Sequence, residues 1–185
     1  IQQFKHDESV TPAEKEFKIV SKSTPSNDWG GGNSIYLDRH KVDCGKDGIN
    51  SFRLRRPAGN RLSYNYDCLS GINLPSTDTN TGANNWGGGN TIYLDRHNVD
   101  CNGKPIAHFK LTRPKRDELS YRYGCIDYTG KQQCRDLNTG WNRESSSSIY
   151  LDRHHVKCNT DEFLSQFRLA RDGNGNFRYN YKCCK

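Results

Sequence analysis

The sequence has no methionine and few aliphatic residues. Hydrophobic residues make up 32% of its 185 positions, and the mean hydropathy is -1.01. Aromatic residues reach 11%, with ten Tyr. Because each aromatic side chain buries a large area, Tyr, Phe and Trp are expected to form much of a thin core. A chain of this length suits one domain.

The sequence also has no long apolar run and no Cys-x-x-Cys pair. No segment approaches the roughly 20 apolar residues that cross a bilayer, which argues against a membrane span. The missing Cys-x-x-Cys pair and the adjacent Cys183-Cys184 argue against a zinc site. The first residue is Ile1 rather than Met, which is typical of a chain whose leader has been removed. We therefore expect a secreted, extracellular protein.

The sequence contains a threefold repeat. Ile-Tyr-Leu-Asp-Arg-His occurs at 35–40, 92–97 and 149–154, and each copy starts 57 residues after the last. In every copy a Val-x-Cys, a Phe-x-Leu and a closing segment that ends in Cys follow. The expected organisation is a single domain, 1–185, with an N-terminal segment at 1–27 and repeats at 28–84, 85–140 and 141–185.

Eight cysteines indicate disulfide bonds in an oxidising compartment. Six occupy equivalent repeat positions, separated by 24, 24 and 25 residues. The simplest pairing joins Cys44 to Cys68, Cys101 to Cys125 and Cys158 to Cys183. Cys134 and Cys184 remain for a fourth bridge, although eight cysteines allow many other connectivities.

Alternating apolar and polar residues predict a β-hairpin in each repeat. Phe52 and Leu54 alternate with arginines, and Leu62, Tyr64 and Tyr66 alternate with polar residues, on either side of a turn signal at 57–60. The segment 51–68 is therefore predicted to be a hairpin, with 114–117 and 172–176 as the matching turns. Residues 16–20 also alternate and could add a first strand.

The hexapeptide itself is predicted to be a strand whose phase slips across 38–41, which indicates a bulge or tight turn. No helical period of useful length is present. An all-β fold with threefold pseudosymmetry follows, either a β-prism or a β-trefoil. The long repeats and the disulfide-closed hairpins favour the prism.

Two extracellular families resemble this pattern. The arrangement Cys44-x(3)-Gly48-x(3)-Phe52-x-Leu54, followed by a strand ending in Cys, is similar to the repeats of the vitelline-membrane outer-layer protein family, as is the ending Cys183-Cys184. That resemblance implies a threefold β-prism held by four disulfides. Trp followed by a hairpin that ends aromatic-x-aromatic-x-Cys resembles, more loosely, the dermatopontins, matrix proteins of which some act as lectins. Neither resemblance implies a catalytic residue.

Two repeated motifs are candidate ligand sites. The first is Asp-Arg-His, at Asp38, Arg39 and His40, at Asp95, Arg96 and His97, and at Asp152, Arg153 and His154. Its carboxylate could accept sugar hydroxyls while the guanidinium and the imidazole donate. The alternative is a structural staple, in which Asp and Arg pair across the bulge and His bonds the backbone.

The second motif is a Trp followed by glycines, at Trp29, Gly30 and Gly31 and at Trp86, Gly87 and Gly88. An indole face beside a glycine loop is a platform for a sugar ring, and the alternative is a core Trp that enters a turn. The third repeat instead has Trp141 and four serines, so it is expected to bind differently or not at all.

The formal net charge is +7, and many of the cations lie in the predicted hairpins. Such a surface attracts glycans or glycosaminoglycans and acidic matrix proteins, or is an ordinary solvated face. Nucleic acid would respond to the same field, but the expected compartment argues against it. No cofactor and no metal is expected, because the repeated acids are too sparse for a calcium shell.

No Ser, Cys or Glu stands at a fixed offset from the histidine in all three repeats, so no catalytic constellation is predicted. The expected function is a secreted, non-catalytic, lectin-like module that recognises carbohydrate or acidic glycan. The alternative is a structural protein of an extracellular coat, egg envelope or matrix that acts through protein contacts. The sequence does not predict an oligomeric state.

Overall fold

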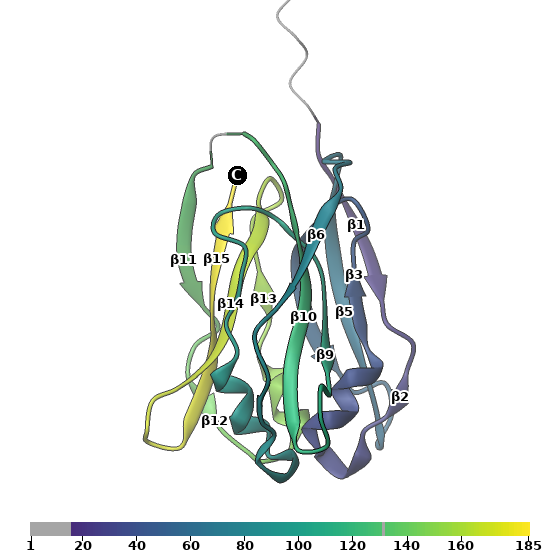
Figure 1. Cartoon of the computed structure of the whole chain (residues 1–185), viewed down its shortest axis with the longest axis vertical. Helices are drawn as coiled ribbons and strands as arrows, with labels where there is room; N and C mark the ends of the chain where they lie inside the picture. Colours follow the sequence, from purple (N-terminus) through teal and green to yellow (C-terminus); the bar gives the residue numbers. More distant parts are fainter. Residues whose placement is uncertain (1–15, 131) are drawn as a thin grey trace, which may run out of the picture.

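A computed structural model describes residues 16–130 and 132–185 as an all-β arrangement of three antiparallel sheets with short 3-10 helices (Figure 1). The first sheet contains β1 (Lys18–Ser23), β2 (Asn27–Asp28), β4 (Gly48–Arg55), β5 (Arg61–Ser70) and β13 (Val156–Lys157). The second contains β3 (Lys41–Asp43), β6 (Ser76–Asn80), β7 (Asn84–Asn85), β9 (Ile106–Thr112) and β10 (Glu118–Ile126). The third contains β8 (Val99–Asp100), β11 (Cys134–Asn138), β12 (Asn142–Arg143), β14 (Phe163–Arg171) and β15 (Asn176–Cys184).

The predicted hairpins are confirmed as the centre of each sheet. β4 pairs with β5, β9 with β10 and β14 with β15, and the register places Phe52 opposite Tyr66 in the first sheet. The suggested N-terminal strand is β1, which pairs with β5. Residues 1–15 of the expected N-terminal segment 1–27 lie outside the described residues.

Each repeat also lends a short strand to the sheet of another repeat. β3 of the first repeat pairs with β9, β8 of the second pairs with β14, and β13 of the third pairs with β4. The exchange runs in one direction and closes on itself. Each sheet is therefore completed by residues from a different repeat, and the repeats form one structural unit.

The core lies where the three sheets meet. Phe52, Phe109 and Phe167 form a triangle with ring centroids 4.7 to 4.9 Å apart, and all three are 1% exposed. Each Phe also contacts a tyrosine of another repeat edge to face, as Phe52 does with Tyr179 at 5.6 Å. The expectation that aromatic residues carry the core is met by these rings, whose edge-to-face packing adds to the burial of apolar area.

The hexapeptide is a 3-10 helix, so its prediction as a bulged strand was wrong. The helices are η2 (Ser34–Arg39), η4 (Thr91–Arg96) and η5 (Ser148–Arg153). In a 3-10 helix the side chains at i and i+3 lie on one face, and Ser34, Leu37 and His40 are all buried. The side chain of Asn33 begins the first helix by accepting from the Ile35 amide at 3.1 Å.

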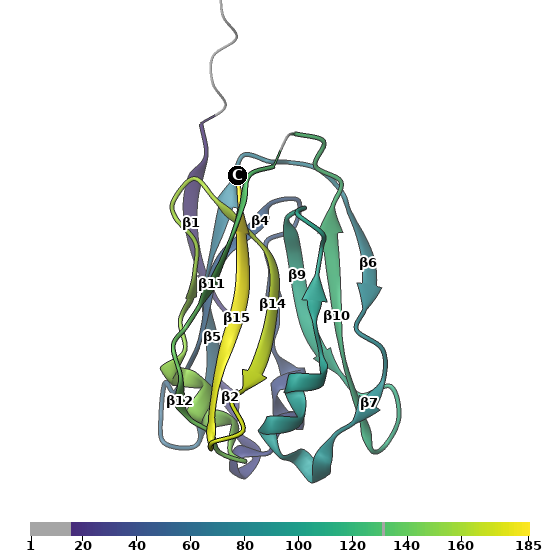
Figure 2. The ribbon, with the colours of Figure 1, turned by 90° about the vertical axis from the view of Figure 1, so that its left-hand side faces the viewer.

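The 3-10 helices lie at the end of the molecule opposite the C-terminus (Figures 1 and 2). The glycine runs form two further 3-10 turns there, η1 (Gly30–Gly32) and η3 (Gly87–Gly89). Among the described residues no helix is long and apolar enough to cross a membrane. The fold thus places the three hexapeptides and the two glycine runs at one end of the molecule.

All four proposed disulfides are present. They join Cys44 to Cys68, Cys101 to Cys125, Cys158 to Cys183 and Cys134 to Cys184. In the chain-entropy account, closing a 24-residue loop stabilises the fold by about 3 kcal/mol. The cysteine spacing was therefore a sufficient guide to the pairing.

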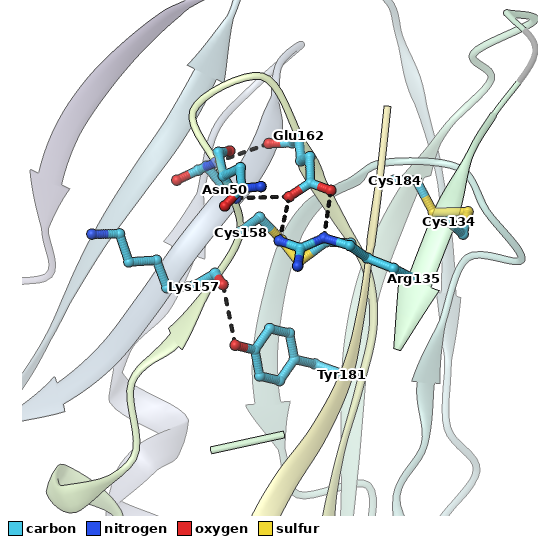
Figure 3. The surroundings of a disulfide bond; sticks show 10 residues. Asn50, Cys134, Arg135, Lys157, Cys158, Glu162, Tyr181 and Cys184 are labelled. Carbon is cyan, nitrogen blue, oxygen red and sulfur yellow. Dashed lines mark hydrogen bonds and ion pairs between the residues drawn. A yellow bond between two sulfur atoms is a disulfide. The ribbon is translucent and has the colours of Figure 1, made fainter. Parts of the chain in front are cut away.

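The third repeat carries one extra residue between Cys158 and Phe167, and an ion pair fixes the loop that holds it (Figure 3). Both Glu162 oxygens accept from Arg135 at 2.8 Å, and one also accepts from the Asn159 amide. The Asn50 side chain of the first sheet donates to the carbonyls of Asn159 and Glu162. The enlarged loop is thereby tied to two sheets.

Candidate functional site

Each of the helices η2, η4 and η5 packs against the hairpin of another repeat. That hairpin lies in the sheet to which the helix's own repeat adds a short strand. η2 contacts β9, η4 contacts β14 and η5 contacts β4. We call these three contact regions the junctions. Each junction brings the Asp-Arg-His motif of one repeat beside the basic hairpin of another, so the two features that the sequence singled out meet there.

The histidine of each motif points into the protein. His40, His97 and His154 are each 1% exposed. Their Nδ1 atoms lie 2.7 to 2.8 Å from the hydroxyls of Thr24, Thr81 and Thr139. The imidazoles meet a tyrosine ring edge to face, as His40 meets Tyr64 at 6.1 Å. The histidines therefore link the 3-10 helices to the core.

The threonine hydroxyl connects each histidine to the neighbouring strand. The Tyr64 amide donates to Thr24 Oγ1 at 2.8 Å, and the same oxygen lies 2.8 Å from Nδ1 of His40. Burial lowers the pKa of His40, His97 and His154, and the neighbouring Arg of each motif lowers that pKa further.

The arginine of each motif turns the other way, to the surface. Arg39, Arg96 and Arg153 are exposed, and their guanidinium carbons lie 4.3 to 4.5 Å from the ring centres of Tyr36, Tyr93 and Tyr150. The cation over the ring holds the guanidinium in place. An asparagine side chain accepts from each Arg at 3.3 to 3.4 Å, so donors remain free.

The aspartate of each motif is half-buried beside cations from the neighbouring hairpin. Arg53 donates from Nε to the Asp152 carbonyl at 2.8 Å, and Arg168 donates in the same way to Asp95. Burial raises the pKa of the Asp38 carboxyl, although Arg39, Arg113 and Lys110 act to lower it. At the third junction Asp152, Arg153, Tyr150 and Arg56 line a depression of about 200 Å3.

The motif is therefore divided between two roles. The three side chains do not converge on one point, because His enters the core while Asp and Arg reach the surface. The suggested pairing of Asp with Arg is not formed, since no ion pair joins the two within any copy of this fully described motif. Asp and Arg stay candidate ligand residues, while the geometry favours a structural role for His.

The glycine runs are shaped by packing. Gly30, Gly31 and Gly32 all have positive φ, at 60°, 66° and 87°, a backbone region that is easy only for glycine. A Cβ on Gly30 would strike the Tyr36 ring, and one on Gly32 would strike Ser147 of the third repeat, whereas one on Gly31 would meet nothing within 4 Å. Only the middle glycine leaves space that a ligand could approach.

The tryptophans differ from one repeat to the next. Trp29 and Trp86 are half-buried and pack against the core, and Arg113 lies 5.9 Å from the Trp86 ring centre. In the third repeat Glu144 takes the position of these tryptophans. The Glu144 amide donates to the Gly175 carbonyl, just as the Trp29 amide donates to the Asn60 carbonyl. Both Glu144 oxygens accept from Arg171 at 2.8 Å, so an ion pair replaces a cation over an indole.

Trp141 is not the counterpart of the other two tryptophans. It is 43% exposed and lies under Arg178, 4.0 Å from the guanidinium carbon to the ring centre. The third repeat therefore places its tryptophan differently, and the expectation that it binds differently or not at all stays a prediction.

Sequence reasoning missed the threonines that hold the histidines. Thr24, Thr81 and Thr139 precede their histidines by 16, 16 and 15 residues. A search for residue types near a fixed offset from the hexapeptide, with a shift of one residue allowed in the third repeat, would have found them. In residues 16–130 and 132–185 no group of three His, Cys, Asp or Glu side chains is placed to hold a metal ion.

Comparisons of this chain with protein-family models, with curated proteins and with solved structures find no match.

Proposed function

We propose that the protein is a secreted, non-catalytic module that binds acidic carbohydrate at its junctions. The observation that carries this proposal is the threefold presentation of a surface Arg and a half-buried Asp beside hairpin cations. Guanidinium groups make forked hydrogen bonds to sulfate and carboxylate. The Asp oxygens can accept from sugar hydroxyls, so each junction offers both kinds of contact that an acidic sugar needs.

The extracellular setting rests on the cysteines. Four disulfides in a small all-β domain are typical of secreted proteins. We further infer that the architecture is a β-prism rather than a β-trefoil, because three separate sheets pack around one aromatic centre. The resemblance to the vitelline-membrane outer-layer family and to dermatopontins remains a proposal on the same grounds.

The proposal is tested by glycan binding of a variant that lacks two junction cations. Arg39→Gln with Arg96→Gln removes two surface guanidinium groups that stack on tyrosines. We expect binding to sulfated and uronate glycans to fall about tenfold or more, because hydrogen bonds to charged groups contribute roughly 1.5–3 kcal/mol. The measurement is the apparent dissociation constant on a glycan array.

The matched control removes the same charge away from the junctions. Lys18 lies opposite Ser70 in the first sheet, and the backbone carbonyl of Lys46 accepts from the Leu74 amide. Lys18→Gln with Lys46→Gln should weaken binding by about twofold at most near physiological salt, because exposed distant charges are screened. Equal losses in the two variants would reject the junctions as the site. An extracellular coat protein that acts through protein contacts would bind no glycan in either form.

A further inference from the structure

The outer face of the first sheet holds a depression that has no counterpart among the three junctions. Its volume is about 200 Å3, and its lining includes Arg53 and Arg55 of β4, Asn65 and Asp67 of β5, and His155. The register explains the grouping, because Arg53 lies opposite Asn65 and Val156 lies opposite Phe52. Side chains two apart on a strand share a face, so both arginines point to this surface.

The cations of this depression have free hydrogen-bonding capacity. Arg53 uses Nε to bond the Asp152 carbonyl at 2.8 Å, which fixes its guanidinium plane. Within the described part of the chain, neither terminal nitrogen of Arg53 bonds a protein atom, and the exposed side chain of Arg55 bonds none. Asp67 accepts from the Ser21 hydroxyl at 2.7 Å and pairs with neither arginine there.

The other two sheets neutralise part of the corresponding surface with ion pairs. On the second sheet Lys41 pairs with Asp43 at 3.4 Å, and Asp78 pairs with His108 at 3.0 Å. On the third sheet Lys182 pairs with Asp136 at 3.9 Å. The first sheet keeps the guanidinium charges of Arg53 and Arg55 beside His155. The pKa of His155 is lowered by burial and then by Arg53, Lys157 and Arg55, with Asp67 acting in the opposite sense.

A second depression continues the first across β5. It measures about 350 Å3 and is lined by Ser21, Lys22 and Ser23 of β1 together with Asn65 and Asp67. The two depressions share Asn65 and Asp67, so short polar groups separate them. On its other side, the Arg53 bond to Asp152 connects the face to the third junction. The combined surface has room for several sugar rings.

We propose that this outer face is a subsite for one acidic sugar of an oligosaccharide, with its sulfate or carboxylate group held between Arg53 and Arg55. Asn65 and Asp67 then meet the hydroxyls of that sugar and of the next one. Lys22 provides a cation in the neighbouring depression. This inference rests on the proposed function, and it makes the first sheet different from its two relatives within the same chain.

The chain itself supplies the test variants. The position of Arg55 is Thr112 in the second sheet and Ala170 in the third, and the position of Arg53 is Lys110 in the second. Arg55→Thr and Arg53→Lys therefore copy residues that the same architecture already accepts. Arg122→Asn is the matched control, because Arg122 occupies the place of Asn65 on the second sheet and also carries one charge.

The experiment is calorimetric titration of a heparin hexasaccharide into the full chain at about 0.15 M salt. We expect Arg55→Thr to weaken binding about tenfold or more and Arg53→Lys to weaken it several-fold, because lysine keeps the charge but loses the fork. Arg122→Asn should stay within about twofold. A hexasaccharide without sulfate groups then shows which anion is held: retained affinity assigns the carboxylate, and lost affinity assigns the sulfate.

Four results would overturn the subsite. If the wild type binds and Arg55→Thr binds equally well, the proposed function stands and the subsite is rejected. If Arg55→Thr and Arg122→Asn lose affinity equally, only general charge attraction is present. If poly-glutamate competes as strongly as the hexasaccharide, the face recognises acidic protein rather than sugar. A wild type that binds no acidic oligosaccharide rejects the subsite and the proposed function together.

Discussion

At the scale of single residues, adjacent glycines with similar φ angles are glycine for different reasons. Gly30 and Gly31 both have φ near 60°, at 60° and 66°. Only Gly30 has a ring, that of Tyr36, where a Cβ would lie. At Gly31 only the positive φ therefore favours glycine. At Gly30 the packing of η2 also leaves no room for a side chain.

Alanine substitutions separate these two effects. Gly31→Ala should lower the free energy of unfolding by about 1–2 kcal/mol, the cost of a left-handed alanine. Gly30→Ala should lower it by a further 1–3 kcal/mol or so, because the Tyr36 ring must move. Urea unfolding of the two variants measures the difference. Equal destabilisation would show that the ring yields freely and that backbone conformation alone selects glycine.

At the scale of elements, the hairpins and disulfides could be predicted and the 3-10 helices could not. The hairpin at 51–68 could be predicted because the alternation of apolar and polar residues is visible within each single strand. The hexapeptide was misjudged because Ile35 and Leu37 imitate a strand, while its true period of three appears only in Ser34, Leu37 and His40. The burial of a histidine in this pattern is explained only by the structure, in which its imidazole hydrogen-bonds with Thr24.

The exchanged strands were beyond prediction for a different reason. β3, β8 and β13 are two or three residues long, and their partners belong to other repeats. Nothing local in Val42-Asp43-Cys44 specifies pairing with His108 or Phe109. The junctions depend on this exchange, so the candidate site could be named residue by residue but not assembled from the sequence.

The loop of the third repeat provides a prediction at this scale. Arg135→Gln should lower the free energy of unfolding by about 2 kcal/mol, because the buried Glu162 carboxylate loses two charge-assisted bonds. Arg135 also holds the pKa of Glu162 below its ordinary value. The stabilisation is thus present near neutral pH and is lost as the pH falls through the lowered pKa.

Lys185→Gln is the matched control for this loop. It breaks the exposed pair between Lys185 and Asp161, whose nitrogen and oxygen are 3.5 Å apart. Such a pair should contribute about 0.5 kcal/mol or less. Thermal unfolding at neutral pH compares the two variants, and a loss in Arg135→Gln no larger than that in Lys185→Gln would show that the ion pair does not fix the loop.

At the scale of the whole molecule, the three buried histidines link stability to pH. Each has a lowered pKa in the folded protein, while the unfolded value is about 6.5. The unfolded state therefore binds more protons below that value, and stability decreases as the pH falls. With three equivalent sites the limiting slope is about 4 kcal/mol per pH unit, and stability is fully retained above pH 6.5 or so.

Urea unfolding between about pH 5.5 and 7.5 measures this slope, above the range in which ordinary carboxylates titrate. His155→Asn is the control, because His155 lies on the outer face of the first sheet rather than in the core, and its place in the second repeat is Asn98. It should leave most of the slope in place. A stability that does not change across this range would mean that the three imidazoles already share their protons equally between the folded and unfolded states.

The proposed sites combine residues of more than one repeat, as the sheets do. Each junction combines a helix of one repeat with a hairpin of another, and the outer face of the first sheet continues from the third junction through Arg53. The most direct test of the account is the binding of the wild-type chain to an array of neutral, sulfated and uronate glycans near physiological salt. The account predicts retention on acidic glycans and little on neutral ones. Absence of binding to every acidic glycan would contradict it.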